Sequence, residues 1–338
     1  MTARARPTPA GQVALSDIQA PVGAALARVG DEMWRIVAVD SALLNGVSEH
    51  LMLMKGKMLR PSLLLLSSEV DGVAEPRAAS YAAVVELIHL ATLVHDDAVD
   101  HSVLRRGMPT INALFTHQVA VIAGDFLYSR AVQELVRLGD LEALRVFAKA
   151  SNELTLGEMR QLSALDALQF SEEDYEFLIR AKTAALFSGA CEVGALCGAE
   201  RFRESMAAYG SHLGMAFQVV DDLLDYTEAS ATVGKPTGLD LKEHKVTLPL
   251  IAALKSMPRT SRAAVDELFA TAEPEDSQIA RVIEIVIEEG GLEYAREQGE
   301  RYASRADDVL ASLPDSPARR ALVSNPRSRR STWRPCQS

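Results

Sequence analysis

Two copies of one acidic pentad, each embedded in apolar sequence, constrain the fold of this chain more than any other feature. The first is Asp96-Asp97-Ala98-Val99-Asp100 and the second is Asp221-Asp222-Leu223-Leu224-Asp225. On a helix, residues i and i+4 share a face, so the outer aspartates of each pentad are expected to point the same way. Clustered carboxylates resist burial unless cations neutralise them, and oxygen ligands of this kind suit Mg²⁺. The repeat therefore predicts two carboxylate clusters that face each other across a cavity with a polyphosphate between them.

The rest of the chain reads as helix. From about residue 16 to residue 321, apolar residues recur at three- and four-residue steps, and no stretch alternates as a strand does. We expect a flexible N-terminal arm at 1–15, a single all-α domain at 16–322 and an irregular basic tail at 323–338. A polar stretch after the second pentad, 227–245, is predicted to form a phosphate lid, with a plain surface loop as the alternative.

Composition excludes several classes of protein. The 338 residues carry a net charge of −11, which argues against nucleic-acid binding. The first residues lack the apolar core of a signal peptide, and no run of about 18 apolar residues predicts a transmembrane helix. The spacing of Cys191, Cys197 and Cys336 matches no zinc site, so we expect reduced thiols and a cytoplasmic protein.

Cationic residues lie beside the acidic motifs. They are Lys57 and Arg60, Arg105 and Arg106, Lys182, Lys235 and Lys245. Scattered cations are usually solvated surface charges, but this placement favours two anionic ligands held at once.

These residues resemble the trans-polyprenyl diphosphate synthases, in particular the octaprenyl diphosphate synthase-like members, over about 17–322. The shared motifs, in chain order, are 56–61 (GKMLRP), 86–100 with Glu86 and His89 ahead of the first pentad, 105–110, 124–127, 157–161, 182–183 (KT), 217–225, 234–235, 240–241 and 245–249. The chain departs from the family at Lys55, where a glycine is usual, and at Met58, where a basic residue is usual.

The resemblance implies an isoprenoid synthase fold, a bundle of ten or more helices around a central cavity. It implies condensation of isopentenyl diphosphate with an allylic diphosphate, with two or three Mg²⁺ ions and a homodimer. A peripheral membrane contact for product release is compatible with it.

It also implies roles for individual residues. The metal ligands would be Asp96, Asp97, Asp100, Asp221, Asp222 and Asp225. The allylic diphosphate would contact Arg105, Lys182 and Lys235, with help from Lys245. Isopentenyl diphosphate would bind at Gly56, Lys57, Arg60, His89 and Arg106, and the reacting carbons would lie near Thr183 and Gln218.

Product length depends on the residues one helical turn before the first pentad. Ala91 and Thr92 occupy these positions, where short-chain members of the family carry a bulky aromatic residue. We therefore expect a product of roughly C30 to C50 for quinone side chains, because small residues leave the tunnel open. Geranylgeranyl diphosphate is the alternative if Val85, Ile88 or a facing helix near 126–131 closes the tunnel.

Other functions remain open at this stage. A class I terpene cyclase shares the fold but normally has a different second metal motif. A non-catalytic subunit of a hetero-oligomeric synthase typically loses the aspartates that are intact here. The pair His95-Asp96 suggests an HD-type phosphohydrolase, but the remaining histidines do not complete that pattern.

Overall fold

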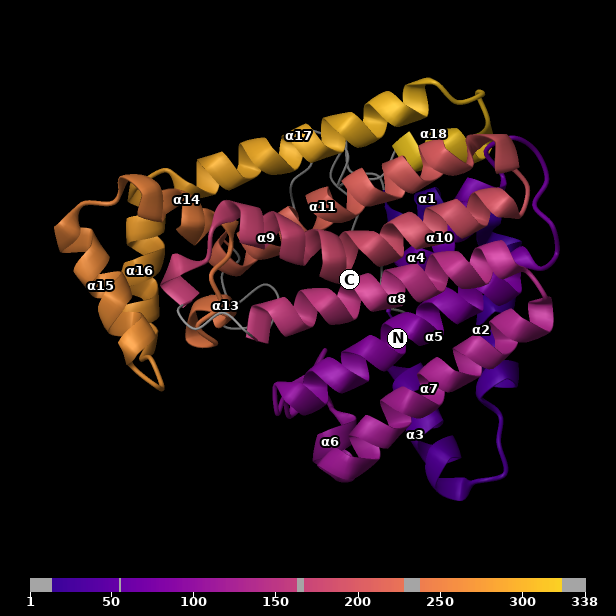
Figure 1. The fold of residues 1–338 in the computed structure, drawn as a ribbon, viewed down its shortest axis with the longest axis horizontal. Coiled ribbons are helices and arrows are strands. Elements are labelled where there is room, and N and C mark those ends of the chain that lie inside the picture. Colours follow the sequence, from indigo (N-terminus) through magenta and orange to yellow (C-terminus); the bar gives the residue numbers. More distant parts are fainter. Residues whose placement is uncertain (1–13, 55, 163–166, 228–237, 324–338) are drawn as a thin grey trace, which may run out of the picture.

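The computed structural model describes residues 14–54, 56–162, 167–227 and 238–323. Their fold is almost entirely helical, and most of the long helices run along one axis of the molecule (Figure 1). The α-helices are α1 (Leu15–Gln19), α2 (Gly23–Val37), α3 (Ala42–Leu53), α4 (Leu59–Ser68), α5 (Ala78–Val99), α6 (Ile111–Leu114), α7 (His117–Leu138), α8 (Leu141–Leu162), α9 (Glu172–Ile179), α10 (Ala185–Leu196), α11 (Arg203–Thr227), α13 (Leu239–Lys242), α14 (Leu248–Ser256), α15 (Arg259–Ala270), α16 (Asp276–Glu288), α17 (Gly291–Ala311) and α18 (Pro317–Val323). Short 3₁₀ turns are η1 (Ala20–Val22), η2 (Ala167–Gln169) and η4 (Glu200–Phe202), and η3 (Arg180–Ala184) is a π-helical turn. The all-α prediction is confirmed.

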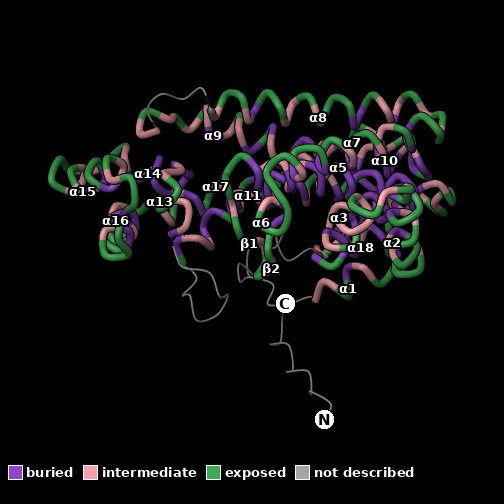
Figure 2. Tube along the Cα trace, turned by 90° about the horizontal axis from the view of Figure 1, so that it is seen from below, coloured by how far each residue is buried: buried purple, intermediate pink, exposed green. Residues whose placement is uncertain are grey.

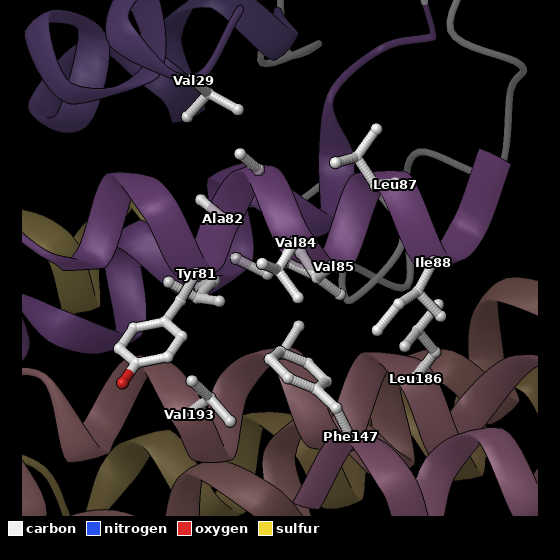
Figure 3. Close-up of a cluster of buried hydrophobic side chains, with 14 of the residues drawn as sticks. Val29, Tyr81, Ala82, Val84, Val85, Leu87, Ile88, Phe147, Leu186 and Val193 are labelled. Atoms are coloured by element: carbon white, nitrogen blue, oxygen red, sulfur yellow. The ribbon is translucent and has the colours of Figure 1, made fainter. Parts of the chain in front are cut away.

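Helix α5 is the centre of the bundle because it is apolar on every side. It packs against α2, α4, α7 and α10. In Figure 3, Val84 and Ile88 of α5 point toward Phe147 of α8 and Leu186 of α10, and all four are buried. By length and composition alone, α5 could cross a membrane, but 78% of its most apolar window is buried inside the structure, as expected for a core helix.

Two glycines let α11 approach α10 closely. A Cβ at Gly210 would lie 2.5 Å from the Phe187 carbonyl oxygen, and one at Gly214 would lie 2.6 Å from Ala184 Cα. Only hydrogen fits at either position. This close packing places the start of the second pentad, two turns beyond Gly214 along α11, beside η3.

One short β-hairpin interrupts the helical chain. Strands β1 (Leu104–Arg105) and β2 (Met108–Pro109) pair antiparallel through a two-residue turn in which Arg106 has φ 53° and Gly107 has φ 76°. Positive φ at both positions is the geometry of a type I′ turn. The sequence analysis expected no strand, because strands of two residues are too short to show alternation.

The helices at the C-terminal end form a second core with α9 and α11. Tyr175, Val219 and Leu250 belong to this cluster. The outer pair, α15 and α16, lies at one end of the molecule and is largely exposed (Figure 2).

Candidate active site

A cavity of about 980 Å³ lies between the two pentads. Seven carboxylates line it, among them Asp96 and Asp100 from the end of α5, Asp222 from α11 and Asp240 from α13. Lys182 and Lys245 line the same cavity. The expected meeting of two acidic clusters is therefore present in the described residues.

The first pentad lies at the C-terminal end of α5, with Asp100 as the C-cap residue. Carboxylates are unfavourable there because the helix macrodipole is negative at that end. Each of the three is compensated by a cation from a different segment. Arg105 Nε donates to both oxygens of Asp97 at 2.8 Å. Lys182 Nζ lies 3.6 Å from Asp96 Oδ2, and Lys245 Nζ lies 3.9 Å from Asp100 Oδ2.

The second pentad is stabilised differently, since the side chain of Asp222 accepts hydrogen bonds from neutral donors in the part of the chain that the structure describes. The Tyr175 hydroxyl donates to Oδ2 at 2.6 Å, and Gln218 Nε2 donates to Oδ1 at 2.8 Å. Thr183 Oγ1 in turn donates to Gln218 Oε1 at 2.8 Å. Burial raises the pKa of Asp222 to about 7, although both hydrogen bonds lower it. This carboxylate is therefore short of positive charge.

The three aspartates of the second pentad do not point the same way. Asp221 is exposed. Asp225 accepts hydrogen bonds from the backbone N–H groups of Leu239 (3.1 Å) and Asp240 (3.0 Å), so it caps the start of α13. Burial, together with the nearby charges of Asp222 and Asp225, raises the pKa of Asp240 to about 8.

The carboxylates fit divalent cations that are shared with a ligand. Within the described ranges, no three His, Cys, Asp or Glu side chains stand close enough to hold an ion by themselves. Mg²⁺, however, is typically held by one or two carboxylates and completes its octahedron with water and phosphate oxygens. Burial also raises the pKa of Asp96. An added cation would offset the negative charge of the carboxylates at Asp96 and at Asp222.

Lys182 and Thr183 lie on the π-helical turn η3, a rare element found mostly at functional sites. Lys182 Nζ lies 2.5 Å from Glu158 Oε1 of α8, as well as near Asp96. Burial alone would lower the pKa of Lys182, but the two carboxylates together raise it, so the ammonium group stays charged. The residue before Glu158 is Gly157, which allows α8 to approach η3 closely.

A second cationic cluster surrounds Glu86 of α5. Gly56, Arg60 and Arg106 converge there, since a Cβ on Gly56 would lie 3.0 Å from Arg106 Nη1 and 3.5 Å from Glu86 Oε1. Arg60 stacks over the Phe187 ring at 4.8 Å, and its buried Nε has no acceptor among the described residues.

The charges in this cluster are unbalanced. Burial lowers the pKa of Arg60 to about 10, with Glu86 raising it and Arg106 lowering it. Burial also lowers the pKa of His89 well below its usual value, and the neighbouring arginines add to the effect, so this imidazole is neutral. One carboxylate facing two guanidinium groups leaves net positive charge, which suits an anion.

The apolar part of the cavity runs along α5 away from the carboxylates. Ala91, Thr92 and Ile88 line it, as do Ser151 of α8 and Tyr128 of α7. The small side chains at 91 and 92 leave this part open, as the sequence predicts. The residue that ends it on α5 is Ile88, which is 2% exposed.

His95 contacts α7 rather than forming a histidine–aspartate metal pair. Its Nε2 lies 3.3 Å from Asp125 Oδ1 and 3.2 Å from the Val121 carbonyl oxygen. The ring packs on Gly124, where a Cβ would lie 2.3 Å from it. The phosphohydrolase alternative therefore finds no support in this geometry.

Most of the residues singled out in the sequence gather in these two clusters, with a few exceptions. Lys57 is exposed, and its carbonyl oxygen accepts from Gln19. Gly234 and Lys235 lie outside the described residues. The sequence alone did not single out Tyr175, which belongs to no motif, and it assigned no role to Glu158 or Asp240 although both lie in motifs.

Comparison with known proteins gives consistent matches over most of the chain. The polyprenyl synthetase family model matches residues 41–286. An all-trans-nonaprenyl-diphosphate synthase (geranyl-diphosphate specific) of Rhodobacter capsulatus is 40% identical over 309 residues, covering 91% of this chain and 94% of the relative. The octaprenyl diphosphate synthase of Escherichia coli (strain K12) is 38% identical over 290 residues, covering 84% and 88%. The crystal structure of a polyprenyl synthase from Caulobacter crescentus CB15, complexed with calcium and isoprenyl diphosphate, is similar with a TM-score of 0.88 at 33% identity, covering 96% of this chain and all of that one.

Proposed function

This chain belongs to the polyprenyl synthetase family, and from that premise we propose that it condenses isopentenyl diphosphate with farnesyl or geranylgeranyl diphosphate. The product is a medium- to long-chain all-trans polyprenyl diphosphate. One observation carries the proposal: carboxylates of both pentads meet in one cavity together with Lys182 and Lys245. A diphosphate is repelled by these carboxylates unless cations bridge the two, which is the arrangement expected for metal-assisted ionisation.

Each cluster has its own substrate in this proposal. The allylic diphosphate binds between the pentads, where Asp96, Asp100 and Asp222 and their neighbours would hold two or three Mg²⁺ ions. When bound, these ions supply Lewis-acid stabilisation of the leaving diphosphate. Isopentenyl diphosphate binds at Arg60 and Arg106, where positive charge exceeds negative charge.

The reaction breaks the allylic C–O bond and leaves a carbocation and pyrophosphate. Lys182, fixed between Asp96 and Glu158, stabilises the pyrophosphate where its charge develops. The hydrogen-bonded pair Thr183 and Gln218 lines the cavity near the reacting carbons, where its polar groups stabilise the cation. The isopentenyl double bond then forms the new C–C bond, and a pyrophosphate oxygen removes the proton that restores a double bond.

We expect a product of C30 to C50. The open path past Ala91 and Thr92 supports this length. The nonaprenyl and octaprenyl products in the names of two relatives agree with it. Geranylgeranyl diphosphate is the alternative if Ile88 stops growth early.

A homodimer completes the proposal. Apolar side chains are exposed on neighbouring elements, with Leu104 of β1 at 62%, Leu114 of α6 at 47% and Ile122 of α7 at 61%. Patches of this kind mark interaction surfaces. We also propose that the enzyme is cytoplasmic, since Cys191 and Cys197 are buried free thiols. A peripheral contact with the membrane, where the apolar product is released, is a separate part of the proposal. Light scattering of the purified protein tests the dimer, and flotation with vesicles tests the membrane contact.

The deciding experiment is incubation with radiolabelled isopentenyl diphosphate, Mg²⁺ and geranyl, farnesyl or geranylgeranyl diphosphate. Products are sized after phosphatase treatment. Chains of C30 or longer support the proposal, and a stop at C20 supports the geranylgeranyl alternative. A cyclic hydrocarbon would indicate a terpene cyclase, and no incorporation with any primer would contradict catalysis by this chain alone.

A further inference from the structure

Tyr175 of α9 is a buried residue that touches the cavity but belongs to no recognised motif. Its side chain is 2% exposed, and its hydroxyl donates to Asp222 Oδ2 at 2.6 Å. Gln218 of α11 donates to the other oxygen at 2.8 Å. The carboxylate therefore cannot rotate without breaking a hydrogen bond to one of two different helices.

Helix α9 is itself fixed, so Tyr175 acts from a rigid support. Ser171 and Asp174 form a capping box at its start. On the face that carries Tyr175, Glu172 accepts from the Tyr294 hydroxyl (2.7 Å) and Glu176 accepts from the Tyr302 hydroxyl (2.7 Å), both from α17. Residues three and four apart share a helix face, so all three contacts hold the same side of α9.

The donors on Asp222 differ in kind from the donor on Asp97. Arg105 neutralises Asp97 with a full positive charge. Tyr175 and Gln218 orient Asp222 without neutralising it, so its negative charge stays available to a cation in the cavity. Partners of this kind fix ligand orientation and commonly change metal affinity by about 10- to 100-fold when they are removed.

We propose that Tyr175 is a positioning residue: its hydroxyl fixes the Asp222 carboxylate in the orientation that receives the cation-bridged diphosphate. This inference rests on the proposed function of the cavity. Tyr175 acts through Asp222 and not on the reacting atoms.

The test is Tyr175→Phe, which removes one oxygen atom and keeps the ring. Tyr209→Phe is the matched control, because it also removes the hydroxyl of a buried tyrosine, whose hydrogen bond goes to the Leu322 carbonyl oxygen away from the cavity. Two quantities are measured for each: the Mg²⁺ concentration at half-maximal elongation, and calorimetric binding of Mg²⁺ with inorganic pyrophosphate to the free protein.

Tyr175→Phe should raise both the half-maximal Mg²⁺ concentration and the dissociation constant by about 10- to 100-fold. Tyr209→Phe should leave both near the wild-type values. Equal values for the two variants would overturn the inference. If wild-type protein elongates no primer, the proposed function fails instead, and the binding measurement still compares the two variants.

Discussion

Gly157 is the residue whose enlargement should damage catalysis far more than stability. It faces Ala181 across the contact between α8 and η3, and a Cβ at this position would lie 2.7 Å from Ala181 Cβ. Carbon atoms pack at about 3.5–4.0 Å, so Gly157→Ala requires the two elements to separate by about 1 Å. Glu158 and Lys182 directly follow the two clashing residues, so the separation acts on their ion pair.

The structure predicts the size of the effect of Gly157→Ala on stability and on catalysis. Overpacking a helix contact costs about 1–3 kcal/mol, and replacing a helical glycine with alanine returns about 1 kcal/mol. The net loss in free energy of unfolding is therefore about 0–2 kcal/mol. A misplacement of about 1 Å near reacting groups can cost about 100-fold in rate, because the charged group no longer meets the transition state. We expect kcat/KM for the allylic diphosphate to fall toward that limit.

Steady-state elongation kinetics and thermal unfolding of the same preparations measure the two effects. Gly189→Ala is the matched control, because its Cβ would lie 3.4 Å from Val146 Cγ1, an ordinary contact on the same side of α8. This control should keep wild-type kinetics and gain up to about 1 kcal/mol. Wild-type kinetics and an unchanged melting temperature for Gly157→Ala would refute the close-contact reasoning.

Three further predictions follow from the site. Ala91→Phe fills a cavity-lining position that is 1% exposed, so product sizing should show chains of C20 or shorter with incorporation retained; unchanged C30 or longer products would contradict this. Arg60→Gln should raise KM for isopentenyl diphosphate about 10- to 100-fold through loss of a charged hydrogen bond, while KM for the allylic substrate changes little. The exposed control Arg28→Gln should leave both KM values near those of the wild type. In chelator-treated protein, calorimetry should show a melting temperature that falls from pH 6.5 to pH 8.5. Burial raises the pKa of Asp222 to about 7 and that of Asp240 to about 8. In this pH range the folded state therefore holds protons that the unfolded state has lost, and the free energy of unfolding declines as these protons leave. A melting temperature that rises with pH would reject this assignment.

The fold was largely predictable because local and global signals agree. Helix α5 is apolar on every side and becomes the buried centre of the bundle. The turn at Arg106 was not predictable, because a non-glycine residue with φ 53° leaves no mark in composition. That turn sends Arg105 to Asp97 and Arg106 toward Glu86, so two adjacent arginines serve different clusters.

The site was predictable where charge and spacing carry the information. Helical spacing alone placed Asp96 and Asp100 on one face, and both line the cavity. The same rule was wrong for the second pentad, where it placed Asp221 and Asp225 together. The Asp225 carboxylate instead caps the start of α13, where the chain has changed direction. Tyr175 is invisible in sequence because its role depends on contacts 47 residues away with Asp222. The contact of Lys235 with the allylic diphosphate stays a prediction, because this residue lies outside the described part of the chain.

The periodicity of α5 also explains how one helix serves both binding and chain growth. Asp100, Asp96, Thr92 and Ile88 follow one another at four-residue intervals, and all four line the cavity. From the carboxylate at 96 to the side chain at 88 the axial distance is about 12 Å, since each residue rises about 1.5 Å. Glu86 is ten residues from Asp96, which turns it about 80° away from that stripe, and it faces the arginines instead. Substitutions along the 88–100 stripe should therefore change product length or ionisation, while substitutions at Glu86 should change affinity for the second anion.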